Sequence, residues 1–182
     1  MVIGLTGPNA SGKGEAASYI KSKGFIYHSL SDILREDAEK RSLEPLRENL
    51  INLGNELRRI NGPSFLALRL RERLLDTEDH IVDSIRNPAE VEELSKSHDF
   101  TLIGIDAPVE TRFKRSLKRK RPGDADTLQE FIAKEEKENK DSFENQQLQR
   151  CLKMADVVII NDSTVDQLHR NIDEAIKKSR KT

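Results

Sequence analysis

The sequence predicts a three-layer α/β fold, in which helices cover both faces of a five-stranded parallel sheet. One pattern in the sequence leads to this prediction. Five short apolar runs alternate along the chain with longer stretches whose apolar residues recur at helical spacing. Such alternation is typical of right-handed strand–helix–strand crossovers, which join parallel strands and place helices on both faces of the sheet. The length of 182 residues suits about one domain, so we expect a single unit over residues 1–182.

The strands are expected where the apolar runs lie, at residues 2–6, 25–27, 80–82, 101–105 and 157–160. The helices are expected between these runs, at residues 14–22, 31–40, 46–59, 64–75, 89–96, 109–120, 127–153 and 165–178. Gly62 and Pro63 separate two of these helices, because glycine tolerates the conformation that ends a helix and proline suits a first helical position. Charge dominates residues 112–147 and strand signals are missing there, so we expect a solvated excursion from the sheet.

The composition limits the classes of protein to which the chain can belong. Its 31 basic and 32 acidic residues nearly cancel, so no overall field favours nucleic acid or an anionic membrane. The single cysteine, Cys151, excludes an internal disulfide and a thiolate zinc cluster, and it fits a reducing compartment. No apolar run approaches membrane-spanning length. We therefore expect a cytoplasmic protein without a membrane partner, and an aliphatic core, since aromatic residues make up only 4%.

A glycine-rich run follows the first expected strand and opens the first expected helix. Residues 7–13 read Gly-Pro-Asn-Ala-Ser-Gly-Lys. At such a junction successive backbone N–H groups can point into one concavity, and the helix N-terminus adds partial positive charge. Lys13 can then supply a point charge to the terminal phosphates of ATP. The residues expected to contact the nucleoside triphosphate are Gly7, Asn9, Ala10, Ser11, Gly12, Lys13, Gly14 and Glu15.

The residues that follow the strands are candidates for the rest of the site, because ligands of open parallel sheets bind beyond the carboxyl ends of the strands. After the third expected strand, Asp83 can hold Mg²⁺ through water and Arg86 can bind a phosphate with two hydrogen bonds. The alternative is that Asp83 caps the next helix and Arg86 pairs with Glu90. Gly14 replaces the Ser or Thr whose hydroxyl commonly touches Mg²⁺, and Glu15 is the nearest side-chain oxygen after it.

Four segments resemble the nucleoside monophosphate kinases of the P-loop group, which include adenylate kinases and dephospho-CoA kinases. Residues 12–15, Gly-Lys-Gly-Glu, are similar to the Gly-Lys-Gly-Thr of adenylate kinases, and residues 31–35, Ser-Asp-Ile-Leu-Arg, to their Gly-Asp-Leu-Leu-Arg. Residues 83–86, Asp-Ser-Ile-Arg, resemble their Asp-Gly-x-Pro-Arg, but lack the glycine and proline and are one residue shorter. Residues 155–162 resemble the last strand of dephospho-CoA kinases.

This resemblance covers nearly the whole chain. It is nearest to an adenylate-kinase-related set and to the kinase-like domain fused to some deoxycytidylate deaminases, which share the Gly-Lys-Gly-Glu, Asp-x-Ile-Arg and closing Ala-Asp segments. It implies a P-loop fold with a helical acceptor-binding arm at about residues 31–75 and a lid at about residues 112–147. Asn161, after the last strand, would lie near the adenine. The expected acceptor contacts are Ser31, Asp32, Arg35, Arg58 and Arg86.

The choice of Arg58 in the arm and of the arginines in the lid depends on where these residues lie along their expected helices. The arginines of the arm that are available to a phosphate monoester are Arg47, Arg58, Arg59 and Arg69. Arg58 is chosen among them because it precedes the Gly62-Pro63 break and can face the cleft from that corner. In the lid, the spacing places Arg112, Arg115 and Arg119 on one helical face. The lid arginines expected to act on the transferring phosphoryl group are Arg115, Arg119 and Arg121. The alternatives for this basic run are a solvated helix face and a nucleic-acid patch, which the sparse aromatic residues disfavour.

The leading functional hypothesis is a magnesium- and ATP-dependent phosphotransferase that moves the γ-phosphoryl group to a nucleotide-like acceptor. A dephospho-CoA kinase is the alternative among enzymes, and a nucleotide sensor or regulatory protein with little turnover is the alternative from another class. The sequence carries no zinc-deaminase signature, so a deaminase partner would be a separate chain. The base and sugar of the acceptor and the formation of a homo-oligomer stay open from the sequence.

Overall fold

The computed structural model describes residues 1–139 and 145–180, and over that part of the chain it contains one sheet of five parallel strands. The strands are β1 (Val2–Thr6), β2 (Ile26–Ser29), β3 (His80–Ile85), β4 (Phe100–Asp106) and β5 (Val157–Ile160). They lie in the order β2-β3-β1-β4-β5, and every paired neighbour is parallel. The predicted sheet is confirmed, and β1, which leads into the glycine-rich loop, is its central strand.

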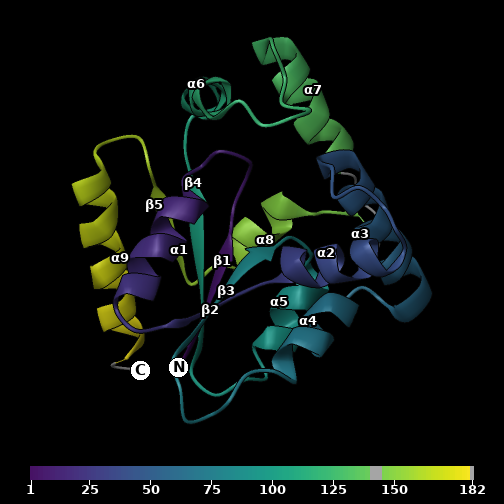
Figure 1. The fold of residues 1–182 in the computed structure, drawn as a ribbon. Coiled ribbons are helices and arrows are strands. Elements are labelled where there is room, and N and C mark those ends of the chain that lie inside the picture. Colours follow the sequence, from purple (N-terminus) through teal and green to yellow (C-terminus); the bar gives the residue numbers. More distant parts are fainter. Residues whose placement is uncertain (140–144, 181–182) are drawn as a thin grey trace.

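Helices cover both faces of this sheet (Figure 1). The helices within the described residues are α1 (Lys13–Ser22), α2 (Leu30–Lys40), α3 (Arg47–Asn61), α4 (Phe65–Arg71), α5 (Pro88–Leu94), α6 (Val109–Arg119), α7 (Leu128–Glu138), α8 (Leu148–Met154) and α9 (Val165–Ser179). Helices α1 and α9 pack on one face, and α2 to α5 with α8 pack on the other. Helices α6 and α7, which carry most of the expected lid, stand beyond the carboxyl edge of the sheet (Figure 1), and their action as a lid stays a prediction.

Two aliphatic cores hold the layers together, one on each face. Ile3 and Leu5 of β1 pack with α1 and α9, whereas Val2 packs with the helices of the opposite face. This division follows from the strand itself, since successive side chains point to opposite faces. All five residues of β1 are buried, because neighbouring strands flank it and helices cover it on both sides. The carboxyl ends of the central strands are therefore firmly positioned.

Strand β3 runs further than the sequence predicts. Its apolar run ends at Val82, yet pairing continues to Ile85, because Ser29 of β2 pairs with Asp83 and Thr6 of β1 pairs with Ile85. The register between β1 and β3 shifts in this stretch, and Ser84 takes a left-handed φ of 67°. Asp83 thus lies inside the strand rather than after it.

The prediction of one long helix at residues 127–153 is wrong. Helix α7 ends at Glu138, and α8 is a separate helix of seven residues. The side chain of Asn139 explains the break, because its Oδ1 accepts a hydrogen bond from the backbone N–H of Leu148, 2.8 Å away, at the start of α8. Residues 140–144 of the expected helix and lid lie outside the described residues. The helix expected at residues 64–75 also ends early, at Arg71.

Among the helices of the described residues, none is long and apolar enough to cross a membrane.

Candidate active site

The loop between β1 and α1 is a tight curl that depends on two glycines. Gly7 has a φ of 141°, and a Cβ atom built on it would lie 2.0 Å from the carbonyl oxygen of Ile105 at the end of β4. Gly12 has a φ of 110°, and its Cβ would lie 2.1 Å from Nδ2 of Asn161. Ala10 also adopts a left-handed φ, 58°. Left-handed residues in a short loop are a feature of backbone nests, in which neighbouring N–H groups can point toward one bound anion.

The interior of this loop contains a hydroxyl that lacks a partner. Ser11 is fully buried, and its Oγ makes no hydrogen bond to any described residue. A buried polar group without a partner costs about 1–3 kcal/mol, so a bound phosphate oxygen would relieve that cost. Gly14, in the first turn of α1, faces open space, and no atom lies within 4 Å of a Cβ built on it.

Lys13 lies across the loop that precedes it. Its Nζ donates hydrogen bonds to the carbonyl oxygens of Gly7 and Pro8, at 2.7 and 2.8 Å. Burial lowers the pKa of Lys13 to about 7, the nearby Asp83 carboxylate opposes this shift, and Arg86 adds to it. The ammonium is thus poised to lose its proton near neutral pH, and a bound polyphosphate would raise its pKa again by favouring the charged form.

Three arginines of α6 make hydrogen bonds to the same loop. Arg112 donates to the carbonyl oxygen of Asn9 at 3.4 Å, and Arg119 donates to the Asn9 side chain at 3.3 Å. Arg115 donates to the carbonyl oxygen of Ser11 at 3.2 Å. The face that these three arginines share is therefore turned toward the phosphate loop. Their action on a transferring phosphoryl group stays a prediction.

Asn161 also contacts the backbone of this loop. Its Nδ2 donates to the carbonyl oxygen of Ser11 at 2.8 Å, and its own carbonyl oxygen accepts from Arg115 at 3.0 Å. The side chain is buried, and its amide is directed at the loop backbone. This contact holds the loop backbone, and the position of Asn161 near the adenine stays a prediction.

Glu15 is directed toward α9. Its Oε1 lies 2.9 Å from Nε2 of His169, and the His169 ring stacks on Tyr19 with centroids 3.8 Å apart. The Glu15 carboxylate thus links α1 to α9. Among the described residues, Glu15 belongs to no group of three or more His, Cys, Asp or Glu side chains that could hold a metal ion.

The end of β3 carries Asp83 and Arg86 into the site. Helix α5 is capped by Asn87, whose side chain accepts from the N–H of Ala89, and Glu90 completes the capping box. Asp83 therefore does not cap α5, because Asn87 does. The side chain of Glu90 pairs with the guanidinium of Arg58 and not with that of Arg86. The Arg86 guanidinium donates to the neutral amide oxygen of Gln146 at 3.0 Å, and burial lowers the Arg86 pKa.

The carboxylates in this region fit a magnesium ion that is held mainly by water and phosphate. Over the described residues, no three His, Cys, Asp or Glu side chains gather into a metal-binding group. Magnesium in phosphate-transfer sites needs only one or two carboxylates, because it keeps several waters and binds the phosphates of the substrate. Asp83 lies close enough to Lys13 to act on its pKa, so it suits a water-mediated contact.

A cavity of about 330 Å³ opens beside this end of β3. Apolar side chains of α2 and α3, such as Leu34 and Leu50, form one part of its wall. Ser31 and Ser84 contribute hydroxyl groups. The arginines that line it are Arg35, Arg47, Arg58, Arg86 and Arg121. A cavity with this lining suits a small acceptor that combines an apolar part with an anionic group.

Ser31 and Arg35, two of the expected acceptor residues, line this cavity and make other polar contacts, whereas Asp32 is not among its lining residues. Arg35 pairs with Asp32 at 2.6 Å, and both side chains are about half exposed. The backbone N–H of Ser31 donates to Ser29, the N-cap of α2. Arg121 lies at the exposed rim, where partial burial and Arg119 lower its pKa. Of the expected lid arginines, Arg121 alone lines the acceptor cavity.

Arg58 lines the cavity but is almost fully buried. It is 3% exposed, and its Nε and Nη2 both donate to Oε1 of Glu90, at 3.0 and 2.8 Å. Oε2 of Glu90 accepts from the backbone N–H groups of Arg86 and Asn87. Arg58 therefore fixes the carboxylate that holds the turn after β3, which makes it a positioning residue for Arg86.

Three residues of this site were not selected as site residues from the sequence. Arg47 lines the cavity at the start of α3, Ser84 lines it from the irregular end of β3, and Gln146 accepts from Arg86. Arg47 is one of several arginines in the arm, and nothing in the helical pattern separates it from them. Ser84 occupies the place of a glycine in the adenylate-kinase segment, which was a signal for an unusual backbone conformation.

Comparisons with known proteins agree with this architecture. The family model described as an AAA domain matches residues 3–149. A UPF0200 protein of Pyrococcus abyssi is 32% identical over 185 residues, which cover 98% of this chain and 96% of that protein. The shikimate kinase of Aquifex aeolicus superposes with a TM-score of 0.57 at 16% identity, covering 99% of this chain and 98% of its own. The dephospho-CoA kinase of Campylobacter jejuni gives a TM-score of 0.54 at 16% identity, covering 98% and 96%. At these identities the structural likeness concerns the fold, which is that of an α/β P-loop kinase-like protein.

Proposed function

The chain belongs to the AAA domain family and to the UPF0200 family, and from this premise we propose that it is an ATP-dependent phosphotransferase acting on a small anionic acceptor, with nucleoside monophosphates as the first candidates. One observation carries the proposal. The phosphate loop with Lys13 lies next to the arginine-lined cavity, because Arg86 lines that cavity and also lies close enough to Lys13 to lower its pKa. A donor site beside an acceptor site is the arrangement that in-line phosphoryl transfer needs.

Each group then has a role in the transfer. The loop amides and Lys13 hold the β- and γ-phosphates of ATP, and Arg86 with Arg35 holds the anionic group of the acceptor. The lid arginines act on the charge that spreads over the transferring group. When bound through Asp83 and water, Mg²⁺ supplies charge neutralisation and alignment of the phosphates.

A nucleotide-binding regulator with little turnover is the second candidate. The contact between Glu15 and His169 favours it, because the position that offers a hydroxyl in adenylate kinases is here a carboxylate bound to another helix. A dephospho-CoA kinase remains the alternative within enzymes. The volume of about 330 Å³ favours a smaller acceptor, since it lies at the low end of the range for ligand sites.

An acceptor screen tests these candidates. ADP release is measured with MgATP and each nucleoside monophosphate, dephospho-CoA or shikimate, the last because shikimate kinases share the fold. The wild-type protein should turn over rapidly with one acceptor class, and Lys13→Ala should lose that turnover while keeping its thermal unfolding curve. Tight ATP binding without any acceptor-dependent turnover would favour the regulator, and near-normal turnover of Lys13→Ala would refute the assignment of the loop.

A further inference from the structure

Arg47 lies between the donor loop and the acceptor cavity. It is the first residue of α3 and lines the cavity of about 330 Å³. It also lines a much smaller cavity whose wall includes Asn9 of the phosphate loop. Its positive charge contributes to the lowered pKa of both Lys13 and Arg86. The guanidinium of Arg47 is therefore within electrostatic range of the groups expected to hold the donor and the acceptor.

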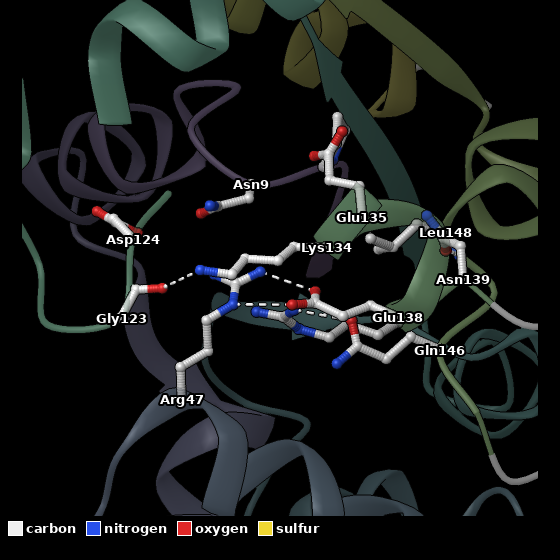
Figure 2. A network of polar contacts seen from close by, with 12 residues as sticks. Asn9, Arg47, Gly123, Asp124, Lys134, Glu135, Glu138, Asn139, Gln146 and Leu148 are labelled. Atoms are coloured by element: carbon white, nitrogen blue, oxygen red, sulfur yellow. Dashed lines mark hydrogen bonds and ion pairs between the residues drawn. The ribbon is translucent and has the colours of Figure 1, made fainter. Parts of the chain in front are cut away.

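Glu138 binds that guanidinium in this structure. Nε and Nη2 of Arg47 donate to the two carboxylate oxygens, at 2.9 and 2.7 Å, across a separation of 91 residues (Figure 2). The two parallel hydrogen bonds match the fork of a guanidinium to a planar pair of oxygens. Two oxygens of a phosphate group present the same geometry, so a carboxylate and a phosphate compete directly for this arginine.

A second carboxylate of α7 makes an equivalent contact on the donor side. Glu135, three positions before Glu138, pairs with Arg112 of α6. Arg112 also donates to the carbonyl oxygen of Asn9 in the phosphate loop. Residues three apart lie on one face of a helix, so α7 turns both carboxylates toward arginines that border the transfer site. Figure 2 shows both glutamates on the side of α7 that faces Asn9 and Arg47.

The charge around the cavity explains why such carboxylates are needed. The cavity concentrates several guanidinium groups, whose mutual repulsion in a partly dehydrated site is costly when no anion is bound. A carboxylate on α7 offsets part of this repulsion. Phosphate groups carry more negative charge and can replace it, so the contact suits an exchange rather than a permanent ion pair.

We propose that Arg47 is a binding residue for the phosphoryl oxygens at the junction of donor and acceptor, and that Glu138 is an internal competitor which the anionic substrate displaces. This inference rests on the proposed function, because it assumes a phosphate-bearing ligand on each side of Arg47. It assigns the acceptor class as one whose own phosphate, or other doubly charged oxyanion, reaches α3.

The test uses the full chain and two anions in separate titrations. The binding of ATP alone, measured by calorimetry, reports on the phosphate loop. Pyrophosphate added to protein already saturated with ADP reports on the acceptor cavity. Glu138→Gln keeps the size and the hydrogen-bonding oxygen of the side chain but removes the competing charge. Glu136→Gln is the matched control, because Glu136 is an exposed residue of the same helix and its substitution changes the net charge equally.

Glu138→Gln should bind pyrophosphate at least about tenfold more tightly than the wild type, the size expected for one charged hydrogen-bond competitor. Glu136→Gln should change it less than about twofold. Arg47→Gln should weaken pyrophosphate binding about tenfold or more, and Glu138→Gln should then have no effect when added to Arg47→Gln. Thermal unfolding of each variant shows whether it is folded.

The outcomes separate the two proposals. If ATP fails to bind the wild-type protein, the proposed function falls. If ATP binds but pyrophosphate affinity is unchanged in Glu138→Gln, or the two substitutions act additively, Arg47 is only a structural link between α3 and α7 and its proposed binding role is overturned. That role is also overturned if pyrophosphate does not bind ADP-saturated Glu138→Gln.

Discussion

Nδ2 of Asn161 donates to the carbonyl oxygen of Ser11, 2.8 Å away and 150 positions earlier in the sequence, and the same nitrogen occupies the space beside Gly12. The end of β5 therefore fixes the curl of the phosphate loop. This contact is possible only because residue 12 has no Cβ atom.

The first prediction concerns Gly12. Gly12→Ala should lose ATP binding and destabilise the protein by about 1–3 kcal/mol, because its Cβ would lie 2.1 Å from Asn161 and its φ of 110° is unfavourable for alanine. Calorimetry and chemical denaturation measure the two effects. For stability, Gly14→Ala is the control, since its Cβ faces open space in a helix and should be neutral or slightly stabilising. Equal stabilities of the two variants would contradict the proposed geometry of the loop.

The second prediction concerns pH. The pKa of Lys13 falls from its ordinary value of 10.5 to about 7 in the folded protein, so the unfolded chain binds more protons between these values. Lys13 alone therefore makes stability rise with pH over that window. ATP binding behaves in the opposite way, because only the charged ammonium holds the phosphates. Affinity should fall by up to about tenfold per pH unit between pH 7.5 and 9.

Calorimetry in buffers of different ionisation enthalpy measures the proton uptake that must accompany this binding. Lys13→Arg is the control, because a guanidinium stays charged throughout the range and should flatten the pH dependence. A wild-type affinity that does not change between pH 7.5 and 9 would show that Lys13 keeps its proton without the nucleotide.

The third prediction concerns the buried pair between Arg58 and Glu90. Arg58→Met should destabilise the protein by about 3–5 kcal/mol, because it leaves the fully buried Glu90 carboxylate without its cation. Adding Glu90→Gln should recover part of that loss, which a double-mutant cycle measures. As a comparison, Arg73→Met removes the exposed pair with Glu36 and should cost less than about 1 kcal/mol. If Arg58→Met and Arg73→Met lost similar amounts of stability, burial would not determine how much each ion pair contributes to the stability of the protein.

The fourth prediction concerns Ser84. Its left-handed φ of 67° is a conformation that glycine adopts without strain. Ser84→Gly and Ser84→Ala both lose the 3.2 Å contact between the Ser84 and Ser29 hydroxyl oxygens, so their difference isolates the backbone. The glycine variant should be more stable than the alanine variant by about 1 kcal/mol, which reverses the usual order within regular structure. Thermal denaturation measures this difference in stability. An alanine variant at least as stable as the glycine variant would contradict the left-handed conformation of residue 84.

Sequence patterns predicted those parts of the fold that depend on local order. The apolar run of β1, the glycines after it and the first helix lie next to one another in the chain, so their joint structure follows from nearest neighbours. The extension of β3 through Asp83 could not be predicted in this way. Its polar residues resemble a loop, and only pairing with Ser29 and Thr6 makes them a strand.

In the candidate site too, the roles of residues depend on partners that are distant in the sequence. The sequence singled out Arg58 for the acceptor site and left Arg47 among the other arginines of the arm, yet both line the cavity. The difference between them is set by partners far along the chain, since Arg58 finds Glu90 and Arg47 finds Glu138. Helical spacing can say which side chains share a face, as it did for Arg115 and Arg119, but it cannot say what lies opposite that face.

The dependence of the loop on Asn161 also bears on synthesis. Ribosomes assemble a chain from its amino end, so the glycine-rich segment emerges long before the strand that shapes it. A nascent chain halted before residue 161 would carry the complete nucleotide motif without the contact that sets its curvature. Competence to hold a triphosphate should therefore arise late in translation, and ribosome-bound fragments should capture little nucleotide.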